Sequence, residues 1–433
     1  MGKMNKKVLI SFLKYVLLGL SIITFGIGIY FTIIIFLPFR AGLARGIAFF
    51  LPQISGFLAV LYLSATLIFL KVMPKKKYRV IKYATVLVIG FFLSFMNFLP
   101  ILTTPVSIQT AEKEFSNAYG NTWRENIPNS INSQFLPTQF NMYNYFLGTP
   151  HPDCNFETDI KYYEDEEVEL YFDVYYPKYR TGNLPGQNSI IINIHGGSWQ
   201  FGDKGIGNVP LLNKYLASQG YIVFDIQYGL LDAGGSSFIP TPEHTKHPNM
   251  TLAKMVFQIG YFTKEVADNY ASQYGGNTDS VYIMGRSAGA HLTGVIGLGY
   301  NDPYFAGNFS EELTLKGLIP IYPPNFANPY FTYEPLNRLI PGDPVSNPLA
   351  YRKFTPSTLV DENDPPAIIY QGLNDQLVPY LNSEAIQNSL ENAGIECIVM
   401  TFPFASHASD LLIGNSFSQV WIYYLERFLY LTQ

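Results

Sequence analysis

SVYIMGRSAGAHLTGVIGLG, residues 280–299, decides the fold of this 433-residue chain. The run SVYIMG is apolar and β-branched enough for a buried strand, and the rest has the composition of a helix. Ser287 falls at the junction, between Gly285 and Gly289, and a tight strand-to-helix turn needs such small neighbours. The pattern therefore predicts a nucleophilic serine at the carboxyl end of a strand, beside the positive dipole end of a helix.

Short apolar runs alternate with helical patterns on both sides of this turn. The other strand candidates are 189–194, 221–226, 315–321, 366–372 and 395–402, and an antiparallel pair is expected around the acidic turn 164–167. The helix candidates are 208–219, 251–273, 287–299, 382–393 and 416–431. Such alternation predicts a mostly parallel sheet covered by helices on both faces. Reactive groups gather at the carboxyl ends of its strands.

A serine needs a base to become a nucleophile, and the base needs an orienting carboxylate. His407 lies in FPFASHASD, after the last strand candidate, and Asp375 lies in YQGLNDQLVP, after the preceding one. Both loops leave carboxyl ends of strands, so we expect them to converge on Ser287. The chain order of these three residues is the order that this kind of sheet uses.

Two other residues compete for these roles. His291 lies four residues after Ser287 on the same predicted helix, where a packed or supporting role is favoured over that of the base. Asp410 lies only three residues after His407, too near in sequence to reach the far ring nitrogen easily. Asp375 is therefore preferred as the orienting carboxylate.

The stretch HGGSW, 195–199, follows a strand candidate and can supply amide donors to an oxyanion. Gly196 and Gly197 let the backbone turn its N–H groups toward a substrate, and the N–H of Ala288 follows the nucleophile directly. We expect His195 to shape this loop through hydrogen bonds. Trp199 and Tyr228 are candidates for a substrate pocket in a chain that is 16% aromatic.

Together, HGGSW, GRSAGAH, GLNDQLVP and ASHAS resemble the α/β-hydrolase fold, and within it the hormone-sensitive-lipase and BD-FAE-like carboxylesterases. The resemblance covers about 156–433. It implies no cofactor, Ser287 as nucleophile, His407 as base, Asp375 as its orienting group, and Gly196, Gly197 and Ala288 as oxyanion donors. The expected substrate is a small acyl ester of a glycan, lipid or similar alcohol. Two alternatives stay open: a transacylase with the same triad, and a non-catalytic binding or adhesion domain.

Residues 1–102 differ physically from the rest, since they hold 12 of the 28 Lys and Arg and no Asp or Glu. The charge-free stretches 15–37, 46–70 and 83–102 each reach the roughly 20 residues that cross a bilayer as a helix. We therefore expect a three-span membrane anchor over 1–102, a spacer over 103–155 and a catalytic domain over 156–433.

The basic residues also predict an orientation. Ten of the twelve lie before the first span or between the second and third, and two lie between the first and second. The positive-inside rule then places the N-terminus in the cytoplasm and the catalytic domain on the far side of the membrane. The acidic balance of residues 103–433, 33 acidic against 16 basic residues, argues against nucleic acid as a partner.

Two further patterns carry little chemistry. His244 and His247 have the spacing of a metal pair, but they lie in a Pro-rich loop without a third ligand, so no metal site is predicted. The chain has only two cysteines, Cys154 and Cys397, which rule out a disulfide framework and leave room for one bridge.

Overall fold

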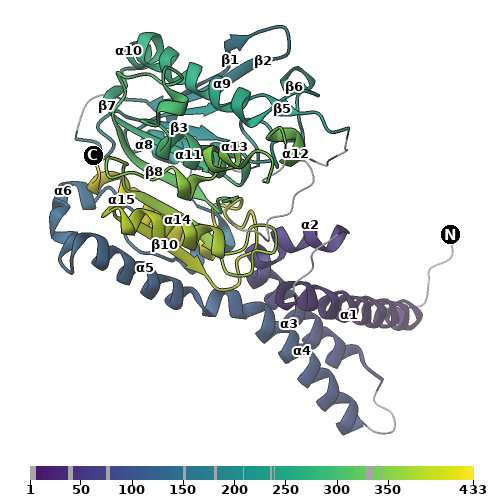
Figure 1. The fold of residues 1–433 in the computed structure, drawn as a ribbon. Coiled ribbons are helices and arrows are strands. Elements are labelled where there is room, and N and C mark those ends of the chain that lie inside the picture. The colour runs from purple at the N-terminus through teal and green to yellow at the C-terminus, as the bar shows by residue number, and fades with distance from the viewer. Residues whose placement is uncertain are drawn as a thin grey trace.

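The computed structural model describes residues 6–37, 42–74, 79–149, 153–179, 183–207, 209–234, 237, 239–326, 336–342 and 345–433. A sheet domain carries a group of helices from the N-terminal part of the chain, which project away from it (Figure 1). The sheet has eight strands in the order β1-β2-β4-β3-β7-β8-β9-β10. Its strands are β1 (Cys154–Glu164), β2 (Glu169–Pro177), β3 (Ser189–Ile194), β4 (Ile222–Ile226), β7 (Asn277–Arg286), β8 (Leu315–Ile321), β9 (Ala367–Gly372) and β10 (Cys397–Phe402).

The sheet is mostly parallel. β2 runs antiparallel to both β1 and β4, and every other neighbouring pair is parallel. A separate two-stranded ribbon joins β5 (Leu230–Leu231) to β6 (Lys246–His247). The predicted fold class, a mostly parallel sheet with helices, is confirmed, and each apolar run expected as a strand forms one.

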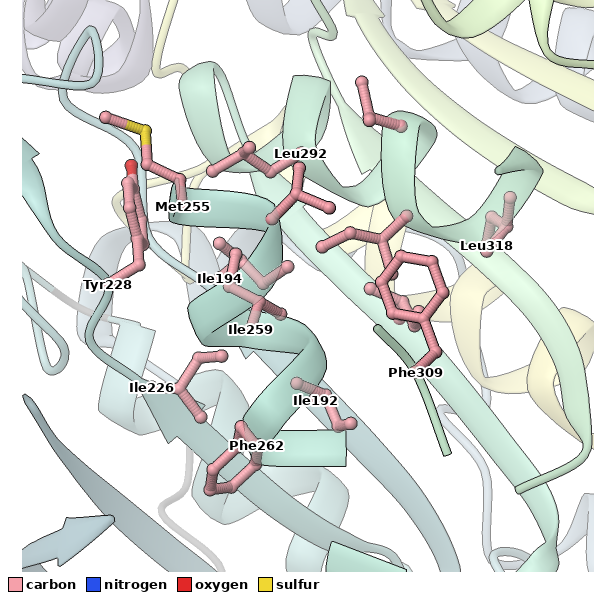
Figure 2. Close-up of a cluster of buried hydrophobic side chains, with 14 of the residues drawn as sticks. Ile192, Ile194, Ile226, Tyr228, Met255, Ile259, Phe262, Leu292, Phe309 and Leu318 are labelled. Carbon is pink, nitrogen blue, oxygen red and sulfur yellow. The ribbon is translucent and has the colours of Figure 1, made fainter. Parts of the chain in front are cut away.

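Two hydrophobic layers cover the sheet because its strands are apolar on both faces. Ile190, Ile192 and Ile194 of β3 pack into one layer, and Ile191 between them packs into the other. The first layer, part of which Figure 2 shows, includes side chains of α9 (Leu252–Glu265), α11 (Ala288–Leu298) and α14 (Leu381–Asn392). The second includes side chains of α8 (Val209–Ser218) and α15 (Ser416–Leu431).

Shorter helical segments fill the connections. They are η2 (Trp123–Asn126), α6 (Asn129–Asn132), α7 (Met142–Leu147), η3 (Glu243–Thr245), η4 (Val266–Tyr270), α10 (Ala271–Tyr274), η5 (Pro303–Phe305), α12 (Leu336–Leu339), α13 (Pro348–Lys353) and η6 (Pro356–Thr358). The helix expected over 251–273 is thus divided, because a π-helical turn separates α9 from α10.

Three N-terminal segments are long and apolar enough to cross a membrane. They comprise α1 (Lys6–Phe36), then α2 (Gly42–Phe50), η1 (Leu51–Ile54) and α3 (Ser55–Val72), and finally α4 (Arg79–Leu102), which continues into the next helix as far as Tyr119. The stretch 46–70, expected as one helix, bends at η1, where Pro52 has no N–H to donate. α3 alone has 18 residues and spans about 27 Å. α2 lies between these helices and the sheet domain (Figure 1).

The segment expected as a spacer packs against the sheet domain. α5 (Thr104–Tyr119) follows α4, and Phe115 and Trp123 are fully buried in the second hydrophobic layer. Glu426 of α15 accepts a hydrogen bond from the N–H of Leu136 at 2.7 Å. The layered body therefore includes side chains from well before residue 156.

Candidate active site

The turn between β7 and α11 holds Ser287 in a strained backbone conformation. Its φ is 53° and its ψ is −117°, in the left-handed region that side chains rarely adopt. A Cβ on Gly289 would lie 2.2 Å from the carbonyl oxygen of Ile194, and one on Gly285 would lie 2.4 Å from that of Gly289. Only glycine fits at these two positions, which explains the sequence pattern around the serine.

Ser287, His407 and Asp375 form a hydrogen-bonded chain. His407 Nε2 lies 2.9 Å from Ser287 Oγ, and His407 Nδ1 lies 2.7 Å from Asp375 Oδ2. The other carboxylate oxygen of Asp375 accepts the N–H groups of Leu377 and Val378, each at 2.8 Å. The three residues follow β7, β10 and β9, so they meet at the carboxyl ends of three parallel strands.

The loop after β3 lies directly beside the serine. A Cβ on Gly196 would lie 2.8 Å from the carbonyl oxygen of Arg286 and 3.3 Å from Ser287 Cβ. Gly197 has a φ of 133°, and a Cβ there would lie 1.7 Å from the carbonyl oxygen of Phe201. Ala288 is the first residue of α11, so its N–H has no acceptor within the helix. Gly196 and Ala288 thus lie beside Ser287, and Gly197 follows Gly196 in the same loop.

His195 and Tyr228 support this loop from within the domain. Their rings stack with centroids 4.5 Å apart, and the Tyr228 hydroxyl donates to the His195 carbonyl at 3.1 Å. His195 Nδ1 lies 2.8 Å from the carbonyl oxygen of Gly196. Burial lowers the pKa of His195, which favours the neutral ring. Tyr228 is fully buried, so its contacts are those of a supporting residue rather than of an open pocket wall.

His291, the rival base, lies in a separate aromatic group. Its Nε2 is 2.8 Å from the carbonyl oxygen of Phe354, and its ring lies 4.3 Å from Phe326 and 5.3 Å from Trp199. Burial lowers the pKa of His291 to about 4, so its ring stays neutral near pH 7. Trp199 is almost completely buried in this group.

Asp410, the rival carboxylate, is engaged elsewhere. Its Oδ2 pairs with Arg286 Nε at 2.6 Å, and its Oδ1 accepts the Tyr322 hydroxyl at 2.7 Å. The Tyr322 ring in turn lies 4.5 Å from the ring of His407. Asp410 therefore connects Arg286, directly before Ser287, with Tyr322, whose ring packs on His407.

Two family models match parts of the chain. The model of the carboxylesterase family matches residues 138–301, and the BD-FAE model matches residues 259–390. The chain is an α/β-hydrolase related to the carboxylesterases.

The hydrolase is similar to two curated proteins of Mycobacterium tuberculosis. It is 29% identical to the probable carboxylic ester hydrolase LipM over 53% of this chain and 51% of that protein. It is 27% identical to the esterase LipQ over 54% of this chain and 53% of that protein. The matched part is thus about half the length of these relatives. Among solved structures, esterase B from Lactobacillus rhamnosis is 22% identical, with a TM-score of 0.47 over 61% of this chain and 81% of that one.

Sequence reasoning missed the part that the N-terminal helices play at the hydrolase site. Ser406 Oγ donates to the carbonyl of Ala48 at 2.7 Å, and the Asn374 side chain donates to the carbonyl of Ile35 at 2.8 Å. The Phe49 ring lies 5.7 Å from that of His407. The sequence held one sign of this contact. Gln53 is the single carboxamide in the apolar stretch 46–70, and its side chain donates a hydrogen bond to the carbonyl of Ala408, next to His407.

Among the described residues, the pair His244 and His247 forms no metal site and the two cysteines form no disulfide. His247 Nδ1 lies 3.6 Å from Glu167, and the described residues contain no group of three His, Cys, Asp or Glu that could hold a metal ion. Cys154 and Cys397 are both free thiols. They lie on β1 and β10, the two edge strands of the eight-stranded sheet.

Proposed function

We propose that the protein is a membrane-anchored serine carboxylesterase that cleaves an acyl ester through an acyl-enzyme intermediate. The observation that carries the proposal is the hydrogen-bonded chain from Ser287 Oγ through His407 to Asp375, at 2.9 and 2.7 Å. These are the distances that a nucleophile, its base and an orienting carboxylate need. The kinship with carboxylesterases supports the same chemistry.

The proposed reaction has two halves. Ser287 Oγ attacks the ester carbonyl carbon and gives its proton to His407 Nε2, and the carbonyl becomes a tetrahedral oxyanion. The N–H groups of Gly196, Gly197 and Ala288 stabilise that charge, each contributing about 3 to 4 kcal/mol in comparable sites. The alcohol leaves with the proton from His407. A water molecule, deprotonated by His407, then attacks the acyl carbon. The bond from that carbon to Ser287 Oγ breaks as His407 returns the proton to Ser287 Oγ, and the acid is released.

We also propose that the three N-terminal segments cross a membrane, with the hydrolase domain on its outer face. The first turn of α1 holds Lys6 and Lys7, the end of α3 holds Lys71, and the start of α4 holds Arg79 and Lys82. These helix ends lie away from the hydrolase domain (Figure 1). This arrangement supports a cytoplasmic location for those ends. A protease added to intact cells should digest the hydrolase domain. Complete protection, beside a digested control outer protein, would contradict the orientation.

The esterase proposal is tested with the full-length protein in nanodiscs and p-nitrophenyl butyrate. Ser287→Ala should lower kcat by at least about 10⁴-fold, since it removes the nucleophile. Ser133→Ala, at an exposed serine remote in sequence from the site, is the matched control and should keep wild-type turnover. A fluorophosphonate probe should label the wild type and the control but not Ser287→Ala. Equal turnover by all three proteins would refute the esterase assignment.

A further inference from the structure

Gln53 lies in η1, at the bend between α2 and α3, and is almost completely buried. Its carboxamide has two N–H donors and an oxygen that accepts two hydrogen bonds, and all four are used. Nε2 donates to the carbonyl of Phe49 at 2.6 Å and to that of Ala408 at 3.0 Å. Oε1 accepts the N–H of Leu412 at 2.9 Å and the side-chain amide of Asn415 at 3.0 Å. Three of these four bonds therefore reach the loop that follows β10.

This loop, which carries His407, has little backbone hydrogen bonding of its own. Among the described residues, Leu411 has the only backbone N–H of 406–414 that donates to a backbone carbonyl, that of Ala408 at 3.4 Å. Ala408, directly after His407, has a φ of 58°, in the left-handed region that residues other than glycine rarely adopt. Such a conformation persists only where its surroundings hold it. The position of His407 therefore depends on side chains from outside the backbone of the loop.

The N-terminal helices also hold the residues that precede His407 and Asp375. Ser406, directly before His407, donates from its Oγ to the carbonyl of Ala48 at 2.7 Å. Asn374, directly before Asp375, donates from its side chain to a carbonyl in the last turn of α1 at 2.8 Å. Both chain neighbours of the proposed base, and one neighbour of its orienting carboxylate, are thus bonded to the N-terminal part.

The bend that carries Gln53 is itself held by Tyr145 of α7, which is almost completely buried. The Tyr145 hydroxyl donates to the Gln53 carbonyl at 3.1 Å and accepts the N–H of Gly56 at 2.8 Å. Asn141, the N-cap of α7, donates its backbone N–H to the side chain of Gln419 in α15 at 2.8 Å. The bend is therefore tied to the sheet domain through α7, and Gln53 presents its carboxamide from a fixed position.

We propose that Gln53 is a positioning residue of the esterase, which holds the loop after β10 so that His407 Nε2 stays within hydrogen-bond reach of Ser287 Oγ. This inference rests on the proposed esterase function and adds part of the N-terminal helices to the same site. Gln53 acts through the Ala408 carbonyl, next to His407, and the chemical steps remain those of Ser287 and His407. A misplacement of about 1 Å can lower kcat by about 100-fold, so even a small relaxation of this loop is costly.

The test uses the full-length protein in nanodiscs and p-nitrophenyl butyrate. Fluorophosphonate titration, carried to completion, counts the competent serines. Gln53→Ala should lower kcat per competent serine by about 100-fold and leave KM unchanged, because His407 acts in both halves of the reaction. Gln53→Glu keeps an oxygen that accepts hydrogen bonds from Leu412 and Asn415, so it should recover part of the loss.

Asn97→Ala is the matched control. Asn97 is a fully buried carboxamide of α4, and it donates to Thr32 Oγ1 at 2.8 Å and to the Leu93 carbonyl at 2.9 Å, within the N-terminal helices. Its loss should lower Tm and keep the wild-type kcat per competent serine. An equal fall of this kcat in Asn97→Ala and Gln53→Ala would overturn the inference, because it would show a general effect of loosened helices.

A second variant keeps the test decisive if Gln53→Ala does not fold. Tyr145→Phe removes the hydroxyl that holds the bend and keeps the Gln53 side chain, so it should lower kcat per competent serine by about 5-fold. Wild-type kcat in Gln53→Ala would overturn the inference, as would wild-type kcat in Tyr145→Phe where Gln53→Ala does not fold. Turnover that does not depend on Ser287 would refute the esterase proposal itself, whatever these variants do.

Discussion

Replacing Asp375 or Asp410 by Asn should separate two roles that the sequence leaves in competition. Asp375 bonds to His407 Nδ1 at 2.7 Å, whereas Asp410 pairs with the buried Arg286 at 2.6 Å. Asp375→Asn should leave the fold intact and lower kcat, because an amide no longer holds His407 in the tautomer that accepts the serine proton. Asp410→Asn should instead reduce stability, because it leaves a buried guanidinium group without its counter-charge.

The two effects differ in size as well as in kind. Loss of the orienting carboxylate typically costs about 10⁴-fold in kcat, or roughly 5 kcal/mol of transition-state stabilisation. Breaking one partner of a buried ion pair typically costs about 3 to 5 kcal/mol of folding free energy. Arg286 and Asp410 are both nearly fully buried, so the upper part of that range is expected. The Tyr322 hydroxyl keeps an acceptor in Asp410→Asn, which limits the loss at His407 to about tenfold in kcat per folded molecule.

The assay combines three measurements on the full-length protein in detergent. Fluorophosphonate titration counts competent serines, p-nitrophenyl butyrate gives kcat per competent site, and a thermal melt gives Tm. We expect Asp375→Asn to keep the wild-type Tm and to lose about 10⁴-fold in kcat per competent site. We expect Asp410→Asn to lose Tm and to lose no more than about tenfold in kcat per competent site. The reverse pattern, with Asp410→Asn inactive at unchanged Tm and Asp375→Asn active, would refute the assignment.

Three further predictions concern other parts of the molecule. Gly289→Ala places a Cβ 2.2 Å from the Ile194 carbonyl oxygen, so it should lower kcat by about 100-fold. Gly26→Ala is the control, because Gly26 has open space around it, and it should keep the wild-type kcat. Equal kcat values for the two variants would contradict this prediction. Burial raises the pKa of Glu426 to about 7, so its contribution to stability is present below its unfolded pKa and is lost as pH rises through 7. Melts from pH 5 to 8 should show about 1 to 3 kcal/mol of this loss in wild type and less in Glu426→Gln; an unchanged slope in the variant would argue against it. A maleimide should label only Cys154 in the native protein, because Cys397 is buried. After unfolding without reductant it should label both thiols. A single labelled thiol after unfolding would contradict the free state of Cys397.

The sequence by itself determined the elements of the sheet and the candidates for its site. Apolar runs bounded by Gly and Pro mark buried parallel strands because such strands are apolar on both faces. The glycines at 285 and 289 mark the turn at Ser287, since no side chain fits there. Loops that leave neighbouring parallel strands must emerge at one edge, so strand order alone predicts that His407 and Asp375 approach the serine.

Only the tertiary structure decided how the remaining polar groups pair and what surrounds the site. Asp410 lies near His407 in sequence, and Asp375 lies beside it in space. Only the side-chain directions pair Asp410 with Arg286 and Asp375 with His407. The contact of Gln53 with the loop after His407 joins residues more than 350 positions apart, and no local pattern encodes such a distance. Residue periodicity reports local conformation, whereas these contacts depend on how the helices pack against the sheet.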